Sequence, residues 1–289
     1  MNFDPEAEPL EKHLGIIPEH FKDWRHEEKT KVVHVGKIMN MNWKVGLEAF
    51  IESYHVIATH SQAMPAIADA NTQYDNYEGS NYNRMLTVMG RPSPHLEVPP
   101  TEQEIFDNMT MEETRVFEGA ADGVVVPEGL SARDVLADIS KENILAYSGV
   151  DVSSSSNSEL LDAIQYFVFP NMFPWGGHMA NIVYRFRPYH NDPNWCLMEV
   201  MILNYAPAGV PKPEPASLRL LDHDEAWADA PELGGLGMVF DQDAANMEQV
   251  QLGLKRSVSG VIQLGNYQES RVRDVHRMID QHIAALENN

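Results

Sequence analysis

Three runs of aromatic and β-branched residues in the middle of the chain limit its fold more than any other feature. They cover residues 163–169, 180–187 and 196–204, and clusters of proline, glycine and asparagine separate them. Runs of this length and composition, bounded by turn-forming residues, are typical of β-strands. The sequence therefore predicts an antiparallel meander at the centre of the fold.

Helical patterns lie on both sides of this predicted sheet. In the first of them, Leu47, Phe50, Ile51 and Tyr54 recur at the spacing of one helix face. Ser131 stands where a helix N-cap is expected. The predicted helices cover residues 42–70, 102–119, 131–145, 238–253 and 269–287.

The remaining segments have no regular period. Residues 1–40 are polar and broken by prolines, and they predict an irregular arm with a first strand near residues 31–35. The serine-rich residues 152–158 predict a solvated loop, and residues 207–215, with four prolines, predict a surface loop. We expect an α+β fold in which this arm precedes one domain, residues 41–289.

Charge excludes one large class of partners. The chain has 43 acidic and 21 basic residues, which gives a formal net charge of −22. Such a surface repels phosphate backbones and anionic lipids, so neither nucleic acid nor a membrane surface is expected as a partner. No apolar run approaches the roughly 20 residues that span a bilayer, and no export signal begins the sequence. A cytoplasmic location is expected.

The single cysteine excludes several kinds of redox centre. Cys196 alone cannot form an intrachain disulfide, a cysteine-rich zinc site or an iron–sulfur cluster, since even the Rieske type needs two cysteines and two histidines. Cys196 lies in a strand-like run, so we expect a small core residue there. Any metal in this chain must use nitrogen and oxygen ligands.

The first predicted helix carries an unusual group of polar side chains. At about 100° per residue, Glu48, Glu52 and His55 share one edge of a half-buried helix. His60 follows five positions after His55, so a shared ion requires a π-bulge or a break between them. The β-branched residues of the 56–59 segment make such a break plausible. Two imidazoles and one carboxylate form the facial triad that suits non-haem iron(II).

The same segment resembles the iron-binding helix of the large subunits of Rieske-type aromatic-ring-hydroxylating oxygenases. The residues that carry the resemblance are Asn42, Trp43, Lys44, Glu48, Glu52, Tyr54, His55 and His60. The segment 240–248 is similar to the family's second motif. It contains Phe240, Asp241, Gln242 and Asp243, and Glu248 follows five positions after Asp243. From the residues alone, a structural role is as good an interpretation as a ligand role: Asp241 and Asp243 would be acidic residues near a helix N-terminus, where the helix dipole favours them.

The resemblance implies a helix-grip fold and a role for each matching residue. His55, His60 and Asp243 would hold Fe(II). Glu52 would connect His55 to the Rieske cluster of a neighbouring subunit, because a carboxylate that accepts the ring N–H fixes the tautomer. Glu48 and Tyr54 are expected to orient the ligands, and Ala49, Phe169 and Asn171 are expected in the substrate pocket.

The activity that the resemblance implies is hydroxylation of an apolar, aromatic substrate by dioxygen, whether as dioxygenase, monooxygenase or demethylase. We expect no Rieske domain before residue 1, so electrons would come from a 2Fe–2S Rieske cluster supplied in trans by another domain or by a ferredoxin and reductase. A homotrimer is expected. Two alternatives stay open: a non-catalytic helix-grip module that binds an apolar ligand, and a zinc hydrolase that uses the same triad.

Overall fold

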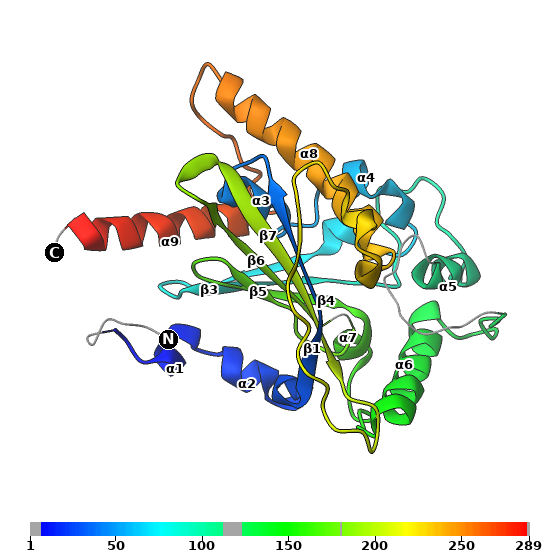
Figure 1. Ribbon diagram of the computed structural model, residues 1–289. Coiled ribbons are helices and arrows are strands. Elements are labelled where there is room, and N and C mark those ends of the chain that lie inside the picture. Colours follow the sequence, from blue (N-terminus) through cyan, green and yellow to red (C-terminus); the bar gives the residue numbers. More distant parts are fainter. Residues whose placement is uncertain (1–6, 112–122, 180, 288–289) are drawn as a thin grey trace.

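An eight-stranded sheet forms the centre of the computed structural model, which describes residues 7–111, 123–179 and 181–287. The strand order is β2-β3-β4-β5-β6-β7-β1-β8 (Figure 1). Neighbours are antiparallel, except that β1 and β8 run parallel. The strands are β1 (Lys29–Met39), β2 (Gln73–Asn76), β3 (Tyr82–Thr87), β4 (Ala163–Val168), β5 (Met172–Pro174), β6 (Ile182–Tyr189), β7 (Asp192–Tyr205) and β8 (Arg219–Leu221).

Helices cover both faces of the sheet (Figure 1). The α-helices are α1 (Leu10–Leu14), α2 (Ile17–Phe21), α3 (Trp43–Ala49), α4 (Val56–Thr59), α5 (Glu102–Thr110), α6 (Ala132–Ser148), α7 (Asn157–Leu161), α8 (Leu236–Arg256) and α9 (Ser270–Glu287). The 3₁₀ turns are η1 (Lys22–Trp24), η2 (His26–Glu28), η3 (Ser61–Ala63), η4 (Asp69–Asn71), η5 (Trp227–Asp229) and η6 (Pro231–Leu233). Figure 1 shows α3, α4 and α8 on one side of the sheet and α1 and α2 on the other.

Strand β4 shows how the two layers share the sheet. All six of its residues are buried, because one face meets the interior and the other meets the N-terminal arm. Ile164 and Tyr166 pack with Ile17 and Trp24 of the arm. The alternate residues of β4 therefore point to the opposite face, where α3 and α8 lie.

The predicted α+β fold and the antiparallel meander are confirmed. The predicted first strand lies within β1, and the three predicted runs correspond to β4, β6 and β7, although position 180 is outside the described residues. Ser131 caps α6 through a hydrogen bond from the backbone N–H of Asp134, as expected. Cys196 is a fully buried core residue, and burial raises the pKa of its thiol to about 12.

The arm and two loops are more regular than expected. Residues 7–28 form α1, α2 and two 3₁₀ turns that pack on the sheet, so the prediction of an irregular arm is wrong for that part. Within the serine-rich segment, Ser156 caps α7, which begins at Asn157. The helix expected over residues 102–119 ends at Thr110, and positions 112–119 lie outside the described residues. The division of the chain at residue 40 stays a prediction.

The long helix expected over residues 42–70 is wrong. Helix α3 ends at Ala49, and the chain runs irregularly to His55 before α4 begins. Tertiary contacts replace the helical hydrogen bonds there: Arg271 donates to the Ile51 carbonyl over 3.1 Å, and the Ser53 N–H donates to the Tyr74 hydroxyl. The break thus precedes the 56–59 segment, which is itself helical.

Candidate metal centre

Two histidines stand at opposite ends of the single turn of α4. His55 occupies the N-cap position and His60 the C-cap position. Because α4 is so short, both rings project to the same side, with centroids 5.3 Å apart. In a continuous helix, residues five positions apart point in different directions. The break before α4 and the turn after it therefore allow His55 and His60 to face the same side.

Asp243 reaches these histidines from α8. Its side chain is 6% exposed. Two contacts hold this part of α8 on the η5 turn: Asp241 accepts the backbone N–H groups of Trp227 and Ala228, and Gly237 lies so close that a Cβ there would stand 2.8 Å from the Ala228 Cα. Asp241 is therefore a cap for a neighbouring turn, and Asp243 is the acidic residue that faces α4.

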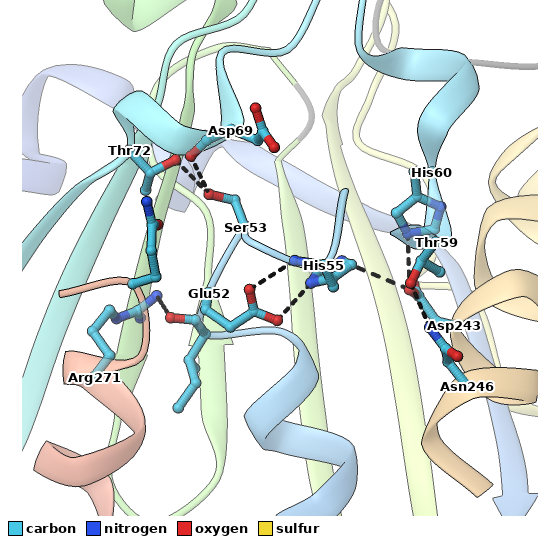
Figure 2. A network of polar contacts seen from close by, with 12 residues as sticks. Glu52, Ser53, His55, Thr59, His60, Asp69, Thr72, Asp243, Asn246 and Arg271 are labelled. Atoms are coloured by element: carbon cyan, nitrogen blue, oxygen red, sulfur yellow. Dashed lines mark hydrogen bonds and ion pairs between the residues drawn. The ribbon is translucent and has the colours of Figure 1, made fainter. Parts of the chain in front are cut away.

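The three side chains converge on one point (Figure 2). Asp243 Oδ1 lies 2.8 Å from His60 Nε2 and 3.8 Å from His55 Nε2. One ligand atom from each residue lies within 4.8 Å of those of the other two. Metal bonds of about 2.1 Å set neighbouring ligand atoms about 3 Å apart. The His60–Asp243 pair has this spacing, and the His55 atom lies within 4.8 Å of both, so the three residues form a candidate set of ligands for one cation.

The outward ring nitrogens fix the tautomers of both histidines. His55 Nδ1 lies 2.7 Å from Glu52 Oε1, and His60 Nδ1 lies 2.8 Å from Gln242 Oε1. These oxygens can only accept, so each Nδ1 carries a proton, and a neutral ring then presents the lone pair of its Nε2 toward Asp243. Lone pairs that face one another in a buried site need a cation between them. The donor set thus fits a metal ion that takes nitrogen and oxygen ligands.

Charge around the site perturbs two further groups. Burial lowers the pKa of His55, but the hydrogen bond and charge of Glu52, together with Asp243, outweigh it and raise the pKa above its ordinary value. Burial raises the pKa of the Tyr184 hydroxyl, and the charge of Asp243 adds to this. Tyr184 therefore stays neutral near the carboxylate.

A cavity of about 180 Å³ lies between the candidate metal centre and the sheet. Its walls are mostly apolar. The lining residues include Ala49, Phe50, Val56, Ala63, Ile67, Met85, Met89, Ala163, Trp175, Met179, Ile182, Tyr184, Leu236, Val239 and Phe240. Its polar lining residues include His55, His60 and Asp243 together with Glu52, Gln62, Thr87 and Gln165. An apolar ligand in this cavity would lie directly against the candidate metal centre.

Several residues expected at the site lie elsewhere. Glu48 is 2.7 Å from His276, and Tyr54 is half exposed with no hydrogen bond within the described part of the chain, so their expected role in orienting the ligands stays a prediction without a direct contact to support it. The reason is the break after Ala49, which separates these positions from the helix face that they were expected to share with His55. Ala49 does line the cavity.

The two other expected pocket residues lie at the far end of β4. Phe169 stacks on His282, with ring centroids 4.2 Å apart, and its carbonyl lies 3.1 Å from a ring nitrogen of His13. Asn171 lies in the turn before β5. Neither belongs to the cavity lining, because β4 ends at Val168 and the turn projects beyond the cavity.

Sequence reasoning also missed residues that complete the site. Gln242 holds His60 and accepts a second hydrogen bond from Gln62 Nε2 over 2.9 Å. Its position beside Asp243 in the late motif was the signal available for it. Met85, Thr87 and Gln165 reach the cavity from β3 and β4, and no pattern in the sequence places these two strands opposite α4.

Comparison with known proteins gives one family match. The family model described as "Ring hydroxylating alpha subunit (catalytic domain)" matches residues 21–285. A search among curated proteins finds no match. In the part of the chain that the structure describes, no helix is both long and apolar enough to cross a membrane.

Solved structures with a similar fold are Rieske oxygenases of low sequence identity. A quaternary ammonium Rieske monooxygenase, described in connection with carnitine oxidation by gut microbiota, has a TM-score of 0.53 at 13% identity over 97% of this chain and 58% of its own. Naphthalene 1,2-dioxygenase with bound indole has a TM-score of 0.50 at 15% identity over 97% of this chain and 61% of its own. The 289 residues thus span less than two thirds of these relatives. On the match to the family model, the chain belongs to the catalytic domains of ring-hydroxylating alpha subunits.

Proposed function

We propose that this chain is the catalytic domain of a Rieske-type non-haem iron oxygenase that hydroxylates an apolar, aromatic substrate with dioxygen. The observation that carries the proposal is the convergence of His55, His60 and Asp243 beside an apolar cavity, with both Nε2 atoms directed at Asp243. Membership of the family supports iron as that cation.

Each residue of the site has a separate task. His55, His60 and Asp243 would hold Fe(II), which supplies the redox chemistry that activates dioxygen and keeps coordination positions open for it. Glu52 and Gln242 fix the two ring tautomers. The apolar wall orients the substrate and excludes water, which strengthens the electrostatic interactions at the metal.

Electrons would arrive from a donor outside this chain. We propose a 2Fe–2S Rieske cluster as donor, fed by a ferredoxin or reductase, because one cysteine cannot hold such a cluster. Glu52 is the proposed conduit, since it contacts His55 and also lines a second groove that lies between α3, α8 and the segment before α9. A homotrimer, in which the donor faces a neighbouring iron, is testable by light scattering.

The test is oxygen incorporation from ¹⁸O₂. The iron-loaded chain would be supplied with a Rieske protein, its reductase and NADH, with naphthalene and indane as probes. Labelled hydroxylated product is expected from the wild type and none from Asp243→Ala. Glu248→Gln, on the same helix, is the matched control and should keep wild-type activity. Product formation by Asp243→Ala at the wild-type rate would refute the ligand assignment.

A further inference from the structure

One cavity side chain has a fixed polarity and an unused hydrogen-bond donor. Gln165 lies on β4 and is only 1% exposed, yet it lines the cavity from the sheet side. Arg271 NH1 donates to Gln165 Oε1 over 3.2 Å. An arginine only donates, so the amide oxygen must point toward Arg271 and the amide Nε2 must point away from it.

Arg271 is itself held rigidly. It is fully buried, and its Nε donates to Asn83 Oδ1 over 2.7 Å, while NH1 also donates to the Ile51 carbonyl. Asn83 Nδ2 donates in turn to Asp274 over 3.0 Å. Burial lowers the pKa of Arg271 to about 9, so the guanidinium is charged at pH 7. Figure 2 shows Arg271 on the far side of Glu52 from Asp243. The amide of Gln165 therefore cannot turn over without setting its own N–H groups against those of the guanidinium.

The donor of Gln165 has no partner within the described residues. Its Nε2 takes part in no hydrogen bond, whereas most polar groups around it are engaged: Thr87 bonds to Thr72, and Gln62 donates to Gln242. An unmet donor on a largely apolar cavity wall favours a ligand that supplies an acceptor there. Nine-tenths burial and a free N–H together point to a ligand group at this position.

The position of Gln165 determines how a ligand that binds to it lies in the cavity. Gln165 pairs across the sheet with Met85 on β3 and forms a bridge with Trp175, and both of these residues also line the cavity. The metal ligands come from α4 and α8, on the other wall. A ligand held at Gln165 therefore lies between the sheet and the metal centre, with its oxygen on the sheet and its carbon skeleton toward Asp243.

We propose that Gln165 is a specificity-determining residue that donates a hydrogen bond to an oxygen acceptor on the substrate, so that the preferred substrates are apolar rings bearing a carbonyl or ether oxygen. This inference rests on the proposed function only in taking the cavity as the substrate site. Sites built around a buried polar group discriminate strongly against ligands that leave that group unpaired.

Indane and 1-indanone test this directly, because they share one carbon skeleton and differ by a single carbonyl oxygen. Calorimetric titration of the iron-loaded chain of 289 residues gives a dissociation constant for each probe. The quantity of interest is the ratio of the indane constant to the 1-indanone constant. In Gln165→Leu we expect this ratio to fall about tenfold from its wild-type value, as a single lost hydrogen bond predicts.

Three further variants make the result decisive. Gln165→Glu keeps an acceptor for Arg271 and removes the donor, so the ratio should fall even if Gln165→Leu does not fold. Met85→Leu changes the same wall without changing its polarity. Tyr184→Phe removes a cavity hydroxyl that, like the Gln165 Nε2, has no hydrogen-bond partner within the described ranges. Both should keep the ratio within about twofold of the wild type, less than a typical hydrogen bond contributes.

An unchanged ratio in Gln165→Glu, or a fall in Tyr184→Phe instead, would overturn the assignment. Binding does not need turnover, so this outcome is separate from the fate of the proposed function. If iron is held and hydroxylation occurs but the ratio is insensitive to Gln165, only the role of Gln165 fails. If the ratio responds to Gln165 but no hydroxylation occurs, the oxygenase proposal fails and the ligand site stands.

Discussion

The two residues that hold the outward ring nitrogens should contribute unequally to iron affinity. Glu52 is charged, its side chain is 11% exposed, and it accepts both the Nδ1–H and the backbone N–H of His55. Gln242 is neutral and exposed, and it accepts one ring N–H from His60. Charge-assisted hydrogen bonds are about twice as strong as neutral ones. Glu52 should therefore matter more.

The magnitude follows from what such partners contribute in metal sites, which is about 10–100-fold in affinity. We expect Gln242→Leu at the low end, about tenfold or ~1.4 kcal/mol, and Glu52→Gln at the high end, about 100-fold or ~2.7 kcal/mol. Gln249→Leu, an exposed position on the same helix, should leave affinity unchanged. Competition with a chelator, followed by the iron retained at each chelator concentration, gives the three constants.

The order of the effects is the sharp part of this prediction. If Gln242→Leu weakened iron binding more than Glu52→Gln, the assignment of charge as the deciding factor would be wrong. If Gln242→Leu behaved like Gln249→Leu, the contact between His60 and Gln242 would have no part in holding the metal. Unfolding in urea, measured on the metal-free variants, separates loss of affinity from loss of fold.

Three predictions concern stability. Burial raises the pKa of Glu199, but hydrogen bonds from Arg185 and Arg187 outweigh it and lower the pKa to about 2. Because the folded-state pKa is depressed, the stabilisation by the Glu199 carboxylate is full above pH ~4.5 and is lost toward pH 2. The free energies of unfolding of the wild type and Glu199→Gln, measured in urea, should therefore differ by roughly 1–2 kcal/mol at pH 6 and by less at pH 3. A difference that does not change with pH would refute this. Arg271→Met should lower the free energy of unfolding by about 3–5 kcal/mol, because it leaves buried acceptors unpaired, and a loss below ~1 kcal/mol would contradict that. Ser131→Ala should cost about 1 kcal/mol through loss of the α6 cap, whereas the exposed Ser154→Ala should cost nothing measurable by the same titration.

The sequence predicted the parts of the fold that local pattern determines. The three apolar runs became β4, β6 and β7, since their composition and turn boundaries are local properties. Strands β2 and β3 were missed because Asp75, Asn76 and Asn83 interrupt any alternation of apolar residues. Their place in the sheet depends on pairing with β4, which no short window of sequence contains.

In the candidate site too, local motifs predicted some residues, whereas others depend on tertiary contacts. His55, His60 and Asp243 were predicted because their motifs are local, and the structure brings them together. Glu48 and Tyr54 do not share a helix face with His55, because the continuous helix does not form: Arg271 satisfies the Ile51 carbonyl, and Tyr74 satisfies the Ser53 N–H. Gln165 has no motif at all, since its role depends on a strand that faces α4 across the cavity.

Metal content of the purified chain tests the central claim most directly. Elemental analysis of the wild type should give one iron per chain, and His55→Ala, His60→Ala and Asp243→Ala should each lose it, while His223→Ala, an exposed histidine far along the chain, should retain it. Stoichiometric zinc would favour a hydrolase, and no metal with a tightly held apolar ligand would favour a binding module. Wild-type iron content in all three ligand variants would contradict the account outright.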